Sequence, residues 1–106
     1  MGRSYEVVSA AEFTATEGLA GWRVEGPQAV TTYGTGDFAT GLRLVNEIGR
    51  LAEEADHHPD LLLRYPDVEV RLGTHDTGTL TTADVDLALA IAAAADELGV
   101  PGQQHG

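Results

Sequence analysis

Three of the four histidines in this chain, His57, His58 and His75, are the residues best suited to chemistry. Imidazole is the side chain whose ordinary pKa lets it give or take a proton near neutrality. Two or three imidazoles that converge can therefore supply both an acid and a base without a metal. We expect the adjacent His57 and His58 to point in different directions and to grip two sides of a small planar ligand. The fourth histidine, His105, is interpreted as an exposed residue of the chain end.

Carboxylates flank these histidines at Glu53, Asp56 and Asp76. Each of them can orient an imidazole or select its tautomer by accepting a ring N–H. Glu53 can equally be plain helix surface. Asp84 is interpreted as a helix cap rather than as a catalyst, because it lies three residues after a threonine at a predicted helix start.

A zinc site made by the three histidines is a competing interpretation. The spacing does not favour it, because the chain lacks the His-x-His or His-x-x-x-His pattern that aims two ligands at one ion. The absence of cysteine excludes a disulfide scaffold, a zinc ribbon and a thiol nucleophile.

The length and the net charge of the chain limit the classes of protein to which it can belong. The chain has 106 residues, 17 acidic against 6 basic side chains and a formal net charge of −11, and this acidity disfavours direct binding to nucleic acid. A hydrophobic content of 42% suffices for one core. We expect a single domain over residues 1–106 with a frayed tail at about 101–106. With no apolar run at the N-terminus and none of membrane-spanning length, we expect a cytoplasmic protein without a membrane partner.

The first part of the chain predicts a short helix followed by two strands. Ser9 and Glu12 form a capping-box pattern, so a helix should follow and end near Gly18. Two β-prone runs, 21–25 and 29–33, are separated by a Gly-Pro turn signal and suggest a hairpin.

A longer helix should follow, with Asp37 as its N-cap. It must end by His57, because Pro59 disfavours helical dihedral angles in the residue before it and cannot donate a backbone hydrogen bond. Its predicted buried stripe consists of Phe38, Leu42, Val45, Ile48 and Leu51 or Ala52.

Residues 60–74 predict a second hairpin. A turn at Pro66-Asp67 would pair Tyr65 with Val68. Continued beyond residue 61, the same register would bring His58 opposite His75. The same register pairs Leu63 with Val70 and Leu61 with Leu72 on one face, and Arg64 with Glu69 and Leu62 with Arg71 on the other.

The last helix should start at the cap Thr81, with Asp84 in its first turn, and end near Gly99 and Pro101. Together these elements predict an α+β fold: a four-stranded antiparallel sheet with three helices packed on one face, in the order α-β-β-α-β-β-α. The predicted buried stripe of the last helix consists of Val85, Ala88, Leu89, Ala92 and Leu98.

One pattern spans much of the chain and consists of Glu53-x-x-x-His57-His58-Pro59, Tyr65, His75-Asp76, Gly78, Leu80-Thr81 and Asp84-Val85, with weaker support from Gly21-Trp22 and Asp37-Phe38. This pattern resembles the pterin-4a-carbinolamine dehydratase family. The resemblance runs from about residue 22 to 98, with two departures: Leu61 stands where the family often has an aromatic residue, and Thr79 where it often has a second glycine.

The resemblance implies a hydro-lyase that recycles the pterin cofactor of aromatic amino acid hydroxylases. Its substrate would be 4a-hydroxytetrahydropterin, and its products quinonoid dihydropterin and water. His57, His58 and His75 would line the pterin pocket and share the proton transfers, with the acid and the base unassigned. Weaker candidates for substrate contact are Glu53, Asp56, Thr74 and Asp76. No metal or organic cofactor is implied, and a homodimer or homotetramer is expected.

Two other functions stay open at this point. One is a non-catalytic dimerisation or assembly module of the same fold, because relatives of this fold act in that way. The other is a similar enzyme for a different heterocycle, which Leu61 leaves open. The small-sided face at 88–95 is a candidate contact between subunits, although helix propensity alone explains so much alanine.

Overall fold

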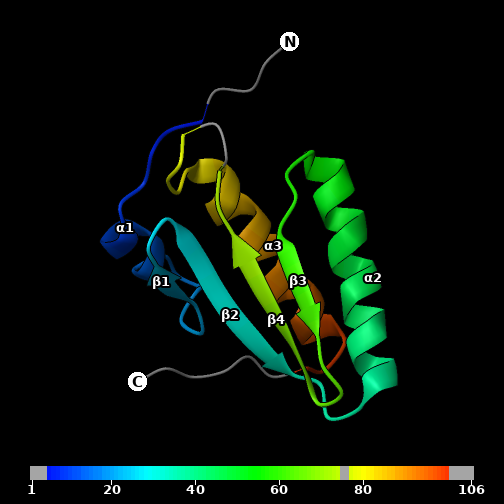
Figure 1. Cartoon of the computed structure of the whole chain (residues 1–106). Helices are drawn as coiled ribbons and strands as arrows, with labels where there is room; N and C mark the ends of the chain where they lie inside the picture. Colours follow the sequence, from blue (N-terminus) through cyan, green and yellow to red (C-terminus); the bar gives the residue numbers. More distant parts are fainter. Residues whose placement is uncertain (1–4, 75–76, 101–106) are drawn as a thin grey trace.

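The helices and strands follow one another in the predicted order (Figure 1). The computed structural model describes residues 5–74 and 77–100. Within these residues no helix is long and apolar enough to cross a membrane. The elements are α1 (Ala10–Thr14), β1 (Arg23–Glu25), β2 (Gln28–Gly34), α2 (Phe38–Ala55), β3 (Asp60–Leu63), β4 (Asp67–Leu72) and α3 (Thr82–Glu97).

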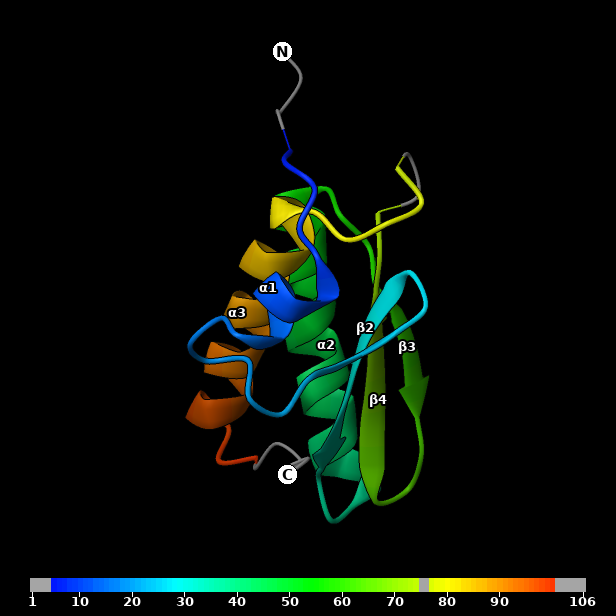
Figure 2. The same cartoon turned by 90° about the vertical axis from the view of Figure 1, so that its left-hand side faces the viewer.

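The strands form one antiparallel sheet in the order β1-β2-β4-β3. All three helices lie on the same side of this sheet, as Figure 2 shows. The predicted α+β fold is therefore confirmed. The core between the helices and the sheet includes Phe13, Trp22, Tyr33, Leu44, Ile48, Val68, Val70, Leu72, Leu87 and Ile91.

The predicted helix caps are present. Ser9 and Glu12 make a capping box at α1, and Asp37 caps α2 by accepting the Thr40 N–H at 2.7 Å. Thr81 begins α3, with Asp84 as its capping-box partner. The helix α1 ends at Thr14, four residues before the predicted Gly18. The predicted tail after Val100 lies outside the described residues.

The predicted register of the second hairpin is wrong by two residues. In the structure Leu63 pairs with Val68 and Leu61 with Val70, and the tip of the hairpin is Tyr65-Pro66. Because the shift is even, each side chain stays on its predicted face.

The neighbouring strand explains this shift. Asp67 is the first residue of β4 and pairs with Gly34 of β2, so it is not free to form the tip. The Pro66 carbonyl accepts the N–H groups of Thr35 and Gly36 at 2.9 and 3.0 Å, which anchors the tip to the turn before α2. The hairpin sequence alone carries no sign of these tertiary contacts.

The buried face of α2 is rotated from the predicted stripe. Phe38 and Leu42 are 47% and 45% exposed and do not belong to the core. The face toward the sheet contains a glycine, which a search for large apolar residues does not detect. That face consists of Gly41, Leu44, Ile48 and Ala52.

The predicted stripe of α3 is also partly wrong. Ala88 is buried as expected, but Leu98 is 39% exposed. Because α3 is apolar around most of its circumference, its periodicity does not select one face. The face at 88–95 was the candidate contact between subunits. Much of this face is instead buried within the chain itself. The buried residues of α3 are Ala83, Asp84, Leu87, Ala88, Ile91, Ala94 and Ala95.

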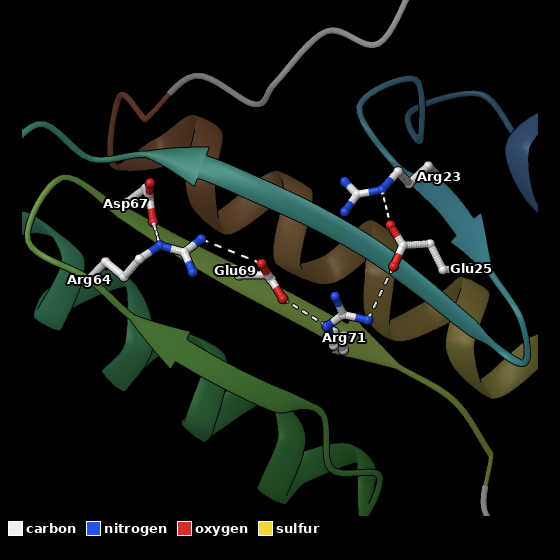
Figure 3. A network of polar contacts seen from close by, with 6 residues as sticks. All are labelled: Arg23, Glu25, Arg64, Asp67, Glu69 and Arg71. Atoms are coloured by element: carbon white, nitrogen blue, oxygen red, sulfur yellow. Dashed lines mark hydrogen bonds and ion pairs between the residues drawn. The ribbon is translucent and has the colours of Figure 1, made fainter.

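Charged side chains cover the sheet face that carries no helix (Figure 3). Arg71 donates to Glu69 at 2.7 Å and to Glu25 at 3.3 Å, and it stands opposite the fully buried Val30. The chain of ion pairs continues through Arg64 to Asp67 at 2.6 Å. These long side chains shield apolar sheet surface with their stems while their charged ends stay in water.

Two glycines of α2 provide a matched test of how closely this helix approaches the sheet. A Cβ on Gly41 would lie 2.7 Å from Cδ1 of Leu63, whereas one on Gly49 would meet no atom within 4 Å. Both replacements by alanine gain helix propensity, worth roughly 0.8–1 kcal/mol. Only G41A must also displace the Cδ1 end of the partly buried Leu63 side chain and crowd Oγ1 of Thr35 at 3.3 Å. Such overpacking costs about 1–3 kcal/mol.

We therefore expect G49A to raise the free energy of unfolding by up to about 1 kcal/mol and G41A to lower it by about 1 kcal/mol. Urea unfolding of both variants checks this. Equal stabilisation of both would contradict the close contact between α2 and β3.

The ion pairs on the open face also predict a dependence of stability on pH. The hydrogen bond from Arg71 holds the pKa of Glu69 below its ordinary value of 4.5. A lowered pKa in the folded state contributes stability above the ordinary carboxylate range, and this contribution is lost as the pH falls through the lowered value.

We expect the stability of E69Q to fall less steeply than that of the wild type as the pH drops through and below the ordinary carboxylate range, measured by thermal unfolding at low salt. E97Q, on the exposed end of α3, serves as the control. It should lose stability with falling pH as the wild type does. The same dependence of stability on acid pH in E69Q and the wild type would contradict the contacts between Glu69 and the arginines.

Candidate functional site

Four chain segments meet at one end of the molecule, where α2 and β4 end and β3 and α3 begin (Figure 1). The end of α2 sets the direction of the histidines. Asp56 adopts a left-handed conformation with φ 49°, and the His57 N–H closes the helix by bonding to the Ala52 carbonyl at 3.1 Å. The left-handed residue turns the chain sharply before Pro59, so the two adjacent histidines leave the helix in different directions.

His57 points toward the start of α3. Its Nε2 lies 2.6 Å from Oδ1 of Asp84, and only 13% of its side chain is exposed. Asp84 is fully buried. Because a buried carboxylate needs partners for its oxygens, this contact holds the imidazole in place.

Asp84 also binds the end of β4. Its Oδ2 accepts the Thr74 hydroxyl at 2.7 Å and the Thr81 N–H at 2.9 Å. The hydroxyls of Thr74 and Thr81 are 2.9 Å apart. One carboxylate therefore joins His57 to Thr74, two predicted site residues that are 17 positions apart in the sequence.

The sequence pattern identified Asp84 as a cap, which is confirmed, but missed its contact with His57. The only signal in the sequence is that the capping carboxylate lies in the first turn of an otherwise apolar helix. Such a position predicts a cap and, by itself, no partner in a distant segment.

His58 forms a second pair with a carboxylate, on the surface. Its Nε2 contacts Oε2 of Glu53, and the two side chains are 56% and 77% exposed. The structure thus brings Glu53 to His58 rather than to His57. Water screens this pair, so it constrains the ring less than the buried pair does.

Two cavities flank this region. The larger, about 560 Å³, is lined by His57 together with Leu51, Leu87 and Thr82 among others. The smaller, about 250 Å³, is lined by Pro27, Gln28, His58, Asp60, Arg71, Gly73, Thr74 and Gly78. His57 and His58 therefore face different cavities, in agreement with the expectation that they point apart.

Several predicted site residues lie away from the histidine pairs or outside the residues that the structure describes. Asp56 is exposed and forms the C-cap of α2. His75 and Asp76 lie outside the described residues, as does the predicted pairing of His58 with His75. Across 5–74 and 77–100 there is no group of three His, Asp or Glu side chains placed to hold a metal ion.

Comparison with known proteins identifies the family. The family profile described as Pterin 4 alpha carbinolamine dehydratase matches residues 6–94. A relative from Trichormus variabilis is 44% identical over 73 residues, covering 69% of this chain and 78% of the relative. One from Rhodopseudomonas palustris is 42% identical over 88 residues, covering 81% and 87%. Both carry the name pterin-4-alpha-carbinolamine dehydratase as a provisional assignment.

A crystal structure from Brucella melitensis shares the fold. That protein is described as a transcriptional coactivator/pterin dehydratase, and it superposes with a TM-score of 0.72 at 28% identity, covering 83% of this chain and 97% of its own. The fold and the match to the family profile thus place this chain among α+β proteins of the pterin dehydratase class. The chain belongs to the pterin-4-alpha-carbinolamine dehydratase family.

Proposed function

We propose that this protein dehydrates 4a-hydroxytetrahydropterin to quinonoid dihydropterin and water, without a metal or organic cofactor. The observation that carries the proposal is the buried Asp84, which holds His57 and Thr74 together at 2.6 and 2.7 Å. This contact brings the segment after α2 and the end of β4 to one place. Family membership supplies the substrate class.

The reaction needs two proton transfers. The C4a–O bond breaks with its electron pair going to oxygen, and an acid protonates the departing hydroxyl to give water. A base takes the proton from N5, and the electrons of that N–H bond form the new N5=C4a double bond. Positioned acids and bases typically accelerate such steps by ~10²–10⁴-fold. His57, His58 and His75 are the proposed groups.

The proposed position of the pterin ring is the mouth of the smaller cavity, between His58, which lines it, and His57, which lines the larger cavity. The volume of the smaller cavity, about 250 Å³, suits a bicyclic ring, and His58 and Thr74 line it. Asp60 offers a carboxylate there for the amino edge of the ring. The Thr74 hydroxyl is engaged with Asp84 and Thr81, so we assign Thr74 a supporting role. Glu53 orients His58 in this scheme.

Single replacement of His57, His58 or His75 by alanine should lower kcat/KM by about 10²-fold or more. The measurement follows the loss of 4a-hydroxytetrahydropterin above its spontaneous rate. H105A, a change near the chain end, is the control and should keep full activity. Absence of acceleration by the wild type would refute the proposed function, and full activity of H57A/H75A would refute the site.

We also propose that the protein self-associates through the outer side of α2 and the edge strand β3. Phe38, Leu42 and Leu62 are exposed there, and the outer edge of β3 has no partner strand in the described part of the chain. Exposed apolar side chains beside an open sheet edge favour a second copy of the same chain. The name of the Brucella protein raises an assembly role as a second candidate function. A cytoplasmic location remains a prediction.

F38E/L42E should reduce the solution mass to that of a monomer, measured by size exclusion with light scattering. L98E alters a comparably exposed leucine at the end of α3 and should leave the mass of the wild-type oligomer unchanged. A monomeric wild type, or an unchanged mass for F38E/L42E, would argue against this interface.

A further inference from the structure

The outer edge of β3 presents backbone groups that no strand in the described part of the chain pairs. The Arg64 N–H bonds to the Asp67 carbonyl at 2.9 Å, so Arg64 makes its backbone hydrogen bond toward β4. Bonded positions alternate along an antiparallel strand, so Leu61 and Leu63 direct their N–H and C=O groups to the open edge. Residues 60–63 contain neither the lysine nor the proline that commonly blocks such an edge.

The side chains of this segment on the open sheet face are an aspartate, a leucine and an arginine. Asp60 and Leu62 stand opposite Arg71 and Glu69, which lie on that face. Figure 3 shows Arg64 there as well. Leu62 is 50% exposed. Asp60 is exposed, and within the described residues it forms no ion pair. An apolar side chain and a carboxylate at the edge thus lack a partner in the single chain.

A second copy of this chain can extend the sheet along the edge by antiparallel pairing of the two β3 strands. Opposite side chains must share a face, so the two-fold axis of such a pair passes through one residue. An axis at Leu62 pairs this leucine with its own copy and Leu61 with Leu63. It also pairs Asp60 with Arg64, so opposite charges meet twice across the interface.

The two neighbouring positions of the axis give poorer pairs. An axis at Leu61 sets Asp60 opposite Leu62, and an axis at Leu63 sets Leu62 opposite Arg64. Either one places a charged side chain directly against an apolar one on the open face. The residue types of β3 therefore favour a single register, with Leu62 on the axis.

We propose that two copies of this chain join at β3 about an axis at Leu62, and that Arg64 of the second copy completes the wall of the smaller cavity beside Asp60. This proposal rests on the function and the self-association proposed above and deepens both. Asp60 lines the smaller cavity and also a third one of about 200 Å³ over β3 and β4. Arg64 has a nitrogen to spare, because its contacts with Asp67 and Glu69 use Nε and Nη2.

Arg64 of the second copy is a positioning residue in this arrangement. It holds one oxygen of the Asp60 carboxylate and leaves the other oxygen to the amino edge of the pterin ring. Tyr65 of the second copy, 67% exposed in the single chain, comes beside Pro59 at the end of the interface. The tip of one hairpin thus reaches the candidate site of the other copy, and each site depends on both chains.

Single cysteines test the register, because the chain has no cysteine of its own. L62C should form a disulfide-linked dimer on mild oxidation. Its two copies face each other as a non-hydrogen-bonded pair with Cα atoms about 4.5 Å apart, which suits a disulfide. L61C and L63C should give little linked dimer, because each lies opposite the other position. L98C, a comparably exposed leucine outside the interface, is the control. Linked dimer is measured by non-reducing electrophoresis.

The contact between Asp60 and Arg64 is tested by the affinity of the dimer. D60N and R64Q should each weaken it by about tenfold, because each change removes two symmetric ion pairs. D60N/R64Q should be no weaker than either single variant. The two residues form no ion pair with each other within one chain, so this coupling reports a contact between copies. At concentrations where the dimer persists, R64Q should raise KM by up to about fivefold with little change in kcat.

The outcomes distinguish this proposal from the function on which it rests. Linked dimer from L61C or L63C instead of L62C would overturn the register. Additive effects of D60N and R64Q, or a monomeric wild type, would overturn the contact even if the enzyme is active. Linked L62C together with coupled effects would establish the shared site wall. A dimer of this kind that does not accelerate the dehydration would overturn the proposed function and leave the interface standing.

Discussion

A single buried carboxylate organises the end of the molecule where the candidate site lies. Asp84 caps the first turn of α3, accepts the hydroxyl at the end of β4 and contacts the imidazole that follows α2. Three elements that are separate in the sequence therefore share one carboxyl group. Since a buried carboxylate without partners costs several kcal/mol, these segments hold one another in place. The helix cap and the positioning of His57 are the same interaction.

The rest of the fold presents the two histidines to different surroundings. The left-handed Asp56 ends α2 and turns the chain, so that His57 enters the interior and His58 stays in water. Gly41 lets the same helix lie close to β3. On the opposite sheet face no helix is needed, because ion pairs cover the apolar surface there. The helix layer and the charged face thus leave the end of the sheet as the position of the candidate site.

Local patterns predicted much of the fold correctly. The caps at Ser9, Asp37 and Thr81 are local hydrogen bonds within a few residues, so the sequence contains all their parts. The order of elements and the α+β class follow from such signals. The hairpin register failed because Asp67 also pairs with Gly34, a partner more than 30 positions away. The stripes of α2 and α3 were predicted in part: Ile48, Ala52 and Ala88 are buried, but Gly41 and the small apolar residues of α3 do not mark a face.

For the candidate site, the sequence by itself determined which side chains are available: adjacent histidines at a helix end, a threonine after a strand and an aspartate at a cap. Residue type and local spacing are enough for that, because proton transfer depends on the imidazole and capping on the nearest turn. Only the tertiary structure decided that His57 meets Asp84 while His58 meets Glu53. That choice depends on how closely α2 and α3 approach each other, which is set by packing over the whole core and not by any local pattern.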